Sequence, residues 1–150
     1  MLSAENLPRD LRLIGGLTLL FALFQVGGLG RGKIFLLTFI VYLSGAVALF
    51  SLASGVSKKE NWSWGAGMIT FSIPVIGSMI GILLHWTSPV YLVANLLIPV
   101  LFLIILVKNK RKIKVSGNLS PLSFTVWGIS FLFFLASNGY LLYLVTSRLQ

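Results

Sequence analysis

The chain has 150 residues, of which 57% are hydrophobic and only 10% are charged, and its mean hydropathy is +0.96. Soluble domains carry about 25% charged residues, so this composition excludes an ordinary water-facing domain and indicates a small bundle of membrane spans. The net charge is +9, from twelve Lys and Arg against three Asp and Glu, and the absence of cysteine excludes disulfides and thiolate chemistry.

The positive charges lie in short segments between apolar runs rather than on one polar domain. High net charge can indicate nucleic-acid binding, but cations in this position are typical of proteins that contact anionic lipid headgroups. We therefore expect membrane lipids as partners, anionic ones at the cytoplasmic face, and no nucleic acid.

Five apolar runs are long enough to cross a bilayer as helices, which takes about 20 residues each. In chain order they cover residues 11–29, 34–55, 65–84, 89–107 and 121–146. The sequence therefore predicts an all-α integral membrane protein, with residues 1–150 forming a single domain. That domain is a bundle of five transmembrane helices, multi-pass in the cell membrane.

The connection between the second and third runs combines cations with tryptophans. Lys58, Lys59 and Glu60 follow the second run, and Trp62 and Trp64 come directly afterwards. Tryptophan is enriched at both membrane–water interfaces, so we expect these two rings to be interfacial anchors. Glu60, beside a lysine and two tryptophans, is expected to be a solvated interfacial group.

Small and amide side chains inside the runs are candidates for helix packing. Gly77 and Gly81 form a GxxxG pair, which lets two helix backbones approach closely within the bundle or between two chains. Asn95 and Asn138 are amides at membrane depth, and helix–helix hydrogen bonding is their simplest use, with a polar ligand as the alternative.

Two prolines interrupt predicted spans, Pro74 in the third and Pro99 in the fourth. Proline removes a backbone donor and kinks a helix, so both positions predict ordinary kinks. The alternative is a pair of broken helices lining a cavity, as in transporters.

His85 is the only histidine and lies in a short turn without Lys or Arg. The absence of basic residues is typical of a non-cytoplasmic loop. A single histidine without cysteine does not make a usual zinc or copper site. We interpret His85 as an interfacial residue, with a haem or pigment ligand shared with a partner as the alternative.

The most basic segment, Lys108–Lys114, separates the fourth run from the fifth and holds five of the twelve cations. Those five, Lys108, Lys110, Arg111, Lys112 and Lys114, are predicted to set the topology and to contact lipid headgroups. With five spans, nine cations fall on the amino-terminal side and only Arg31, Lys33 and Arg148 on the other. Because Lys/Arg-rich loops stay inside, the amino terminus is predicted cytoplasmic and the carboxyl terminus non-cytoplasmic.

The fifth run carries an aromatic stripe. Phe124, Trp127, Phe131 and Phe134 recur at three- and four-residue spacing, so they stack along one helix face. Aromatic side chains offer large contact areas, which favours a protein partner for this face. Lipid tails are the alternative, because lipid accepts any apolar surface.

The segment Ser54–Trp64 (SGVSKKENWSW) and the Asn95-Leu-Leu stretch before the basic cluster carry one resemblance. They resemble a Gly-basic-Trp-x-Trp junction and a last span of uncharacterised small multi-span integral membrane proteins. The resemblance covers about residues 34–114 and implies no activity. The final span from Pro121 departs from the four-span pattern of those proteins.

Neither catalytic residues, nor a cofactor site, nor a metal site is predicted. No Asp, Glu, Lys or Arg lies in the interior of a predicted span, which argues against proton pumps, ion-coupled transporters and voltage sensors. We expect a non-enzymatic accessory or scaffold subunit of a larger membrane complex, acting through helix packing. The alternative is a small transporter or channel for a neutral or weakly polar solute.

Overall fold

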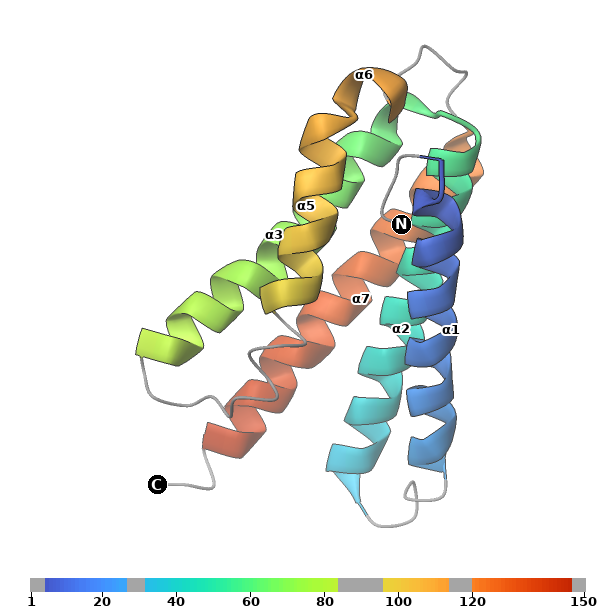
Figure 1. Cartoon of the computed structure of the whole chain (residues 1–150). Coiled ribbons are helices and arrows are strands. Elements are labelled where there is room, and N and C mark those ends of the chain that lie inside the picture. The colour runs from blue at the N-terminus through green and yellow to red at the C-terminus, as the bar shows by residue number, and fades with distance from the viewer. Residues whose placement is uncertain (1–4, 27–31, 84–95, 114–119, 147–150) are drawn as a thin grey trace. The chain divides into compact units, whose positions relative to one another are not determined.

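The computed structural model (Figure 1) describes residues 5–26, 32–83, 96–113 and 120–146, and their regular structure is entirely helical. The helices are α1 (Leu7–Val26), α2 (Lys33–Ser57), α3 (Asn61–Leu83), α5 (Ile98–Lys108), α6 (Lys110–Ile113) and α7 (Pro121–Thr146). The prediction of an all-α chain is confirmed for these ranges. The number of membrane crossings stays a prediction.

Two of these helices are long and apolar enough to cross a membrane. They are α2, with 25 residues, and the Pro121–Tyr140 part of α7, with 20 residues. Their most apolar 18-residue stretches have mean hydropathies of 2.3 and 1.4. At 1.5 Å per residue, α2 is about 37 Å long, more than the hydrocarbon thickness of about 30 Å. Only 22% and 11% of their most apolar stretches are buried, which is unlike the core helix of a soluble domain.

The remaining helices differ from the predicted spans at their ends. α1 begins at Leu7, so Arg9 and Asp10, which precede the predicted first span, belong to its first turn. α5 has 11 residues, and the part of the predicted fourth span before it, residues 89–95, lies outside the described ranges. Pro99 therefore lies in the first turn of α5 rather than in the middle of a helix. Its missing N–H removes no hydrogen bond within α5.

The chain divides into two compact units, which we describe separately. The first unit comprises Met1–Leu7 and Gly55–Leu119, and the second comprises Pro8–Ser54 and Ser120–Gln150. The first therefore holds α3, α5 and α6, together with the last turn of α2. The second holds nearly all of α1, the rest of α2, and α7.

In the first unit, α3 and α5 pack as an antiparallel pair (Figure 1). The rings of Phe71 and Phe102 stack with their centroids 4.7 Å apart, and a β-carbon on Gly67 would lie 3.0 Å from Leu106 Cδ1. From Gly67 to Phe71 the contacts move forward along α3, and from Leu106 to Phe102 they move backward along α5. This register brings the start of α3 next to the end of α5, and it places Pro74 and Pro99 at the same level of the pair.

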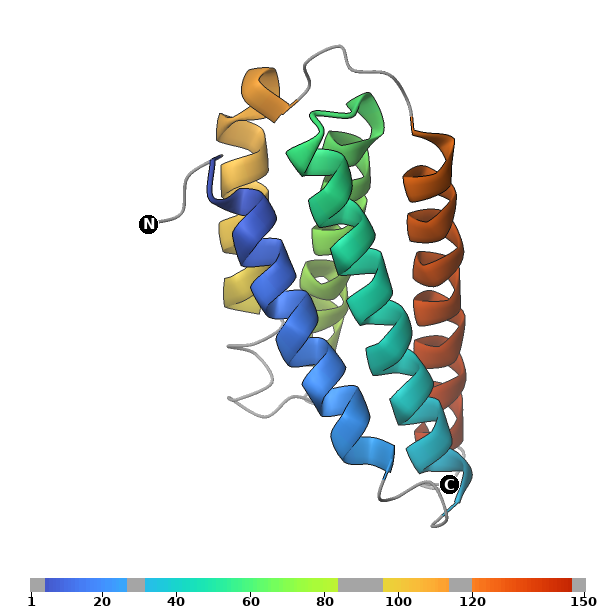
Figure 2. The same ribbon diagram turned by 90° about the vertical axis from the view of Figure 1, so that its right-hand side faces the viewer.

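In the second unit, α1 and α2 run side by side and antiparallel (Figure 2). The rings of Phe21 and Tyr42 stack at 5.9 Å, and Gly15 lets α1 approach Phe50, whose ring would meet an added β-carbon at 3.4 Å. A β-carbon on Gly45 of α2 would lie 3.3 Å from the Phe134 ring of α7 and 3.8 Å from Thr18 Cγ2 of α1. Glycines thus form the contact points of α2 with both of its neighbours.

The four rings of the aromatic stripe do stack along α7. Successive centroids are 6.1, 5.2 and 6.3 Å apart from Phe124 to Phe134. Trp127 and Phe131 are only 7% and 6% exposed, however, and Phe134 packs over Gly45. Among the four, Phe124 alone is exposed, so most of this stripe is the inward face of α7 rather than a surface offered to a partner or to lipid.

The opposite face of α7 is the exposed one, and it is apolar as well. Its large exposed side chains are Leu122, Ile129, Leu132, Phe133, Tyr140 and Tyr143. We call these six residues the outward face of α7. A helix that is apolar all round carries no periodicity to indicate which face turns inward.

Candidate functional site

The strongest concentration of polar chemistry lies where α2 turns into α3. The turn closes with two backbone hydrogen bonds, from Glu60 N–H to Gly55 C=O at 2.9 Å and from Lys59 N–H to Val56 C=O at 3.1 Å. This pair of bonds is the Schellman arrangement that satisfies the last carbonyls of a helix. Lys59 adopts the left-handed conformation the motif requires, with φ of 55°, although glycine is the usual residue there.

Glu60 is buried at the start of α3, with 2% of its surface exposed. Its carboxylate accepts a hydrogen bond from the indole N–H of Trp62, and its backbone carbonyl accepts one from the Ser63 hydroxyl at 2.7 Å. The amino end of a helix favours a negative charge, which adds to the stabilisation of this carboxylate. The expectation of a solvated Glu60 was therefore wrong, because the turn folds the side chain inward.

The two tryptophans in the first turn of α3 differ in their burial and in their contacts. Trp62 is 9% exposed and packs on Gly55, so it is a packing residue rather than the expected interfacial anchor. Trp64 is partly exposed, and its indole N–H donates to the carbonyl of Leu106 in α5 at 3.0 Å. Trp64 thus joins the start of α3 to the end of α5 across 42 residues of sequence.

The predicted basic cluster is largely helical rather than a loop. α5 continues to Lys108, Asn109 breaks the helix with φ of −109° and ψ of 18°, and α6 begins at Lys110. Asn109 satisfies the end of α5, because its backbone and side-chain N–H groups both donate to Ile105 C=O, at 3.0 and 2.9 Å. The short helix therefore holds the cations at defined positions.

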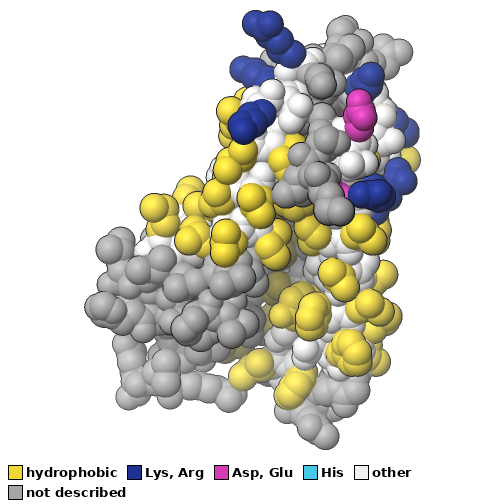
Figure 3. All heavy atoms as spheres, viewed as in Figure 1, with side chains coloured by type: hydrophobic (Ala, Val, Ile, Leu, Met, Phe, Trp, Pro, Cys, Tyr) yellow, Lys and Arg dark blue, Asp and Glu magenta, His cyan; other side chains and the backbone are white. Residues whose placement is uncertain are grey.

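A cation of α6 contacts the start of α3 at this end of the α3–α5 pair. Lys110 Nζ lies 4.8 Å from the centre of the Trp64 ring, a cation–π contact. Lys58, Lys59, Lys108, Lys110 and Arg111 are all exposed, and we call these five residues the basic end. Figure 3 shows Lys and Arg side chains over α6 and the end of α5, with hydrophobic side chains below them on α5.

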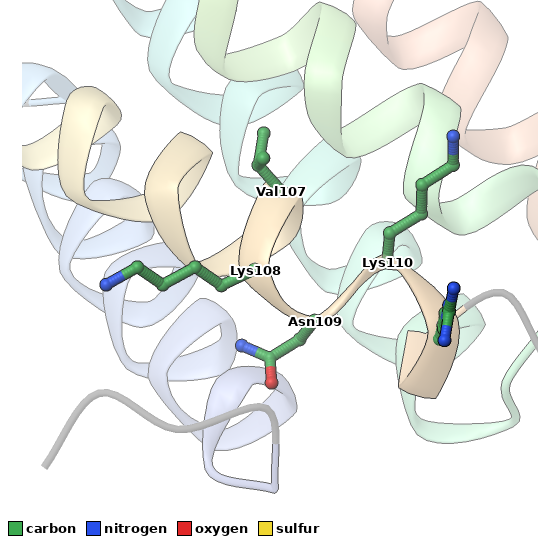
Figure 4. A pocket seen from close by; sticks show the side chains of 5 residues that line it. Val107, Lys108, Asn109 and Lys110 are labelled. Atoms are coloured by element: carbon green, nitrogen blue, oxygen red, sulfur yellow. The ribbon is translucent and has the colours of Figure 1, made fainter.

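An open pocket of about 440 Å³ lies in the basic end, lined by residues 107–111 (Figure 4). In that view Lys108 and Lys110 extend in different directions, and Lys110 reaches toward α3. The lining combines positive charge with the apolar Val107 and the amide of Asn109. This chemistry suits an anion with an apolar part.

The comparisons with known proteins identify no relative. No protein-family model matches the chain, and neither a curated protein nor a solved structure matches it at a significant level. In the part of the chain that the structure describes, no group of three His, Cys, Asp or Glu residues could hold a metal ion.

The remaining predicted site residues are dispersed. Gly77 is exposed, and a β-carbon there would meet nothing within 4 Å in the described chain. Gly81 lies in the last turn of α3. The Asn138 side-chain N–H donates to Phe134 C=O of its own helix at 2.9 Å. Their role in helix packing stays a prediction.

Other predicted positions fall at or beyond the edges of the described ranges. Lys112 belongs to α6. Asn95, Lys114 and His85 lie outside the described residues.

The packing residues that the sequence did not single out are Gly15, Gly45 and Gly67. Each faces a large side chain of a neighbouring helix at 3.0–3.4 Å. They stand in small-residue neighbourhoods, such as Gly15-Gly16 and Ser44-Gly45, which are a weak signal for close helix approach. The GxxxG spacing pointed to Gly77 instead, because spacing alone does not reveal which glycine meets a neighbour.

Proposed function

We propose that this chain is a non-catalytic, multi-pass membrane protein that serves as an accessory or scaffold subunit of a larger membrane complex. In this proposal the five apolar segments cross the bilayer, with the amino terminus cytoplasmic and the carboxyl terminus on the other side. We include in this proposal that its α2–α3 junction resembles that of small multi-span membrane proteins. Its role is to pack against partner helices within the bilayer.

Exposed apolar surface supports the membrane setting. On α1 alone, Leu13, Leu17, Phe21 and Phe24 are more than half exposed, with Phe24 at 78%. Soluble monomers rarely expose contiguous apolar patches of more than a few hundred Å², whereas lipid tails cover such surface without cost.

The distribution of cations within each unit supports the orientation. In the first unit, the basic end gathers cations from the α2–α3 turn and from the α5–α6 segment, all predicted to be cytoplasmic. In the second unit, Arg9 and Arg12 lie at the start of α1, and Lys33 lies at the far end of the antiparallel α1–α2 pair. The five-span topology likewise assigns Lys33 to the opposite side of the membrane from Arg9 and Arg12.

The observation that carries the accessory role is the outward face of α7. Phe133 and Tyr143 are 60% and 65% exposed on a helix whose other aromatic face is already buried. Tyrosine and phenylalanine are enriched at protein interfaces because they bury much area with few rotatable bonds. This face therefore offers a partner helix a rigid aromatic surface, which lipid does not require.

Site-specific photo-crosslinking in native membranes tests this role. A photoreactive phenylalanine analogue placed at Phe133 or Tyr143 is expected to yield a discrete protein adduct. The same analogue at Leu17 or Phe24 of α1 is the matched control, because these positions are apolar and also more than half exposed, and it is expected to label lipid. Equal protein labelling from both helices, or lipid labelling alone from α7, would contradict a specific partner surface.

A different observation favours the alternative, a small transporter or channel for a neutral or weakly polar solute. Pro74 and Pro99 share one level of the α3–α5 pair, and the Ser78 hydroxyl, one turn beyond Pro74, is buried without a hydrogen-bond partner among the described residues. Prolines and free polar groups at one depth are features of transporter sites. Flux of neutral solutes into proteoliposomes, lost in Ser78→Ala but kept in Ser123→Ala, would support this alternative.

A further inference from the structure

We propose that the basic end, formed by Lys58, Lys59, Lys108, Lys110 and Arg111, binds the headgroup of an anionic phospholipid. The inference rests on the membrane setting of the proposed function but not on the existence of a protein partner. It also joins the α2–α3 turn to the cluster after α5, which lie about fifty residues apart in the sequence.

The start of α3 and the α5–α6 segment form one surface. Trp64 donates its indole N–H to Leu106 C=O at 3.0 Å, and Lys110 Nζ stands 4.8 Å from the centre of the same indole ring. Trp64, in the first turn of α3, therefore contacts both α5 and the first residue of α6. Lys58 and Lys59 lie in the α2–α3 turn, three and two residues before α3 begins, so they belong to the same end of α3 that Trp64 joins to α5.

This surface is strongly positive. Its five cations are exposed, whereas Glu60, the single acid in the two segments, is 2% exposed and accepts a hydrogen bond from Trp62. Two carbonyls near the end of α5 also accept side-chain hydrogen bonds, since Asn109 donates to Ile105 and Trp64 to Leu106. These local acceptors therefore leave the cations available to an external anion.

The apolar surface beside the cations fits a lipid rather than another anion. Leu101, Ile104 and Val107 are 41%, 44% and 58% exposed, and their three-residue spacing forms an apolar stripe on α5 that ends next to Lys108. A phospholipid has both a phosphate for the cations and acyl chains for the stripe. Inorganic phosphate or a nucleic acid would use the cations and leave the stripe uncovered.

A lipid headgroup fits the pocket of the basic end. The pocket lined by residues 107–111 has a volume of about 440 Å³, which accommodates a headgroup, and Val107 connects it to the apolar stripe. The cation–π contact restrains Lys110, so a lipid phosphate finds this ammonium already positioned. Each cation near an anionic surface strengthens binding by about fivefold.

Native mass spectrometry of the full chain in neutral detergent tests the proposal without any partner protein. Dioleoyl-phosphatidylglycerol is expected to form adducts at concentrations at least about a hundredfold below those that dioleoyl-phosphatidylcholine requires. The variant Lys108→Gln/Lys110→Gln/Arg111→Gln is expected to lose this preference by about a hundredfold. The control variant Arg9→Gln/Arg12→Gln/Lys33→Gln removes the same charge elsewhere and is expected to stay within twofold of the unmodified chain.

A second variant separates lipid binding from simple attraction of anions. Val107→Gln keeps every cation and is expected to weaken phosphatidylglycerol binding severalfold, with helical circular dichroism unchanged. Equal loss in both triple variants would overturn the proposal, since total charge alone would then explain binding. Displacement of the lipid by inorganic phosphate or by single-stranded DNA at comparable concentration would also overturn it, as either result would show a general anion site.

Failure of this proposal and failure of the membrane setting are distinguishable. Extraction of cell membranes with alkaline carbonate reports on membrane insertion alone, and the chain is expected to stay in the pellet. Retention in the pellet without phosphatidylglycerol preference would reject the lipid site and leave the proposed function intact. Release into the supernatant would reject both.

Discussion

Gly55 and Trp62 share a space that admits no side chain on the glycine. A β-carbon built on Gly55 would lie 2.5 Å from Trp62 Cζ2 and 3.0 Å from two further ring atoms. The contact joins the last turn of α2 to the first turn of α3 across the Lys59 turn. It also holds Trp62 where its indole N–H reaches the Glu60 carboxylate.

Gly55→Ala is therefore expected to destabilise the chain by about 1–3 kcal/mol, because the tryptophan ring must move and its hydrogen bond to Glu60 weakens. The midpoint of thermal unfolding in detergent micelles, followed by circular dichroism, measures the effect. Gly65→Ala is the control, since a β-carbon there meets nothing within 4 Å and alanine favours a helix. Equal behaviour of the two variants would show that Trp62 does not constrain Gly55.

Lys59→Gly is expected to raise the free energy of unfolding by about 1 kcal/mol. Lys59 has φ of 55°, and a non-glycine residue in the left-handed region costs about 1–2 kcal/mol. Lys58→Gly removes the same charge one residue earlier, without relieving a positive φ, and is expected to be neutral or destabilising. A larger gain from Lys58→Gly would point to charge repulsion rather than backbone strain.

Trp64→Phe keeps a ring at the start of α3 but removes the donor to Leu106 C=O. We expect a loss of about 1 kcal/mol, typical of one hydrogen bond, concentrated at the end of α5. Hydrogen exchange of the Asn109 amide, which bonds to Ile105 C=O, is the local readout and should accelerate. The control for general loosening is Phe71→Leu, farther along the same helix pair. Faster exchange of the Asn109 amide in Phe71→Leu but not in Trp64→Phe would contradict the prediction.

Trp127→Ala is expected to cost about 3 kcal/mol, because its ring is buried between Phe124 and Phe131. This is the low end for truncation of a buried aromatic residue, since lipid surrounds the unfolded helix with an equally apolar medium. Leu132→Ala, on the outward face of the same helix, is expected to cost less than about 0.5 kcal/mol. Comparable losses from both would mean that α7 has no inward face.

The five-span topology predicts opposite sides for the chain ends. Cysteines introduced as Ser3→Cys and Gln150→Cys are expected to react with a membrane-impermeant maleimide from the cytoplasmic and the external side respectively. The chain has no cysteine of its own, so the labelling background is low. Both positions reacting from the same side would exclude an odd number of crossings.

Helical structure and apolar surface could be predicted because they depend on local composition. The run that begins at Pro121 matches α7 to its described end, Thr146, and the run 34–55 is one residue inside α2 at its start and two at its end. Proline starts a helix and long apolar stretches continue it, so these boundaries follow from neighbouring residues alone. Charge counting likewise assigned the α2–α3 turn and the α5–α6 segment to one side, and these are the segments that meet at the basic end.

The tertiary structure decided which faces turn inward and which polar groups are buried. Phe131 and Leu132 are adjacent and both apolar, yet one is 6% exposed and the other 66%. Hydrophobicity does not discriminate between the faces of a helix that is apolar all round, so only contact with neighbours orients it. Glu60 shows the same limit, because a carboxylate in a basic turn is expected to face water unless a helix start and an indole N–H are brought to it, and those partners depend on how α2 turns into α3.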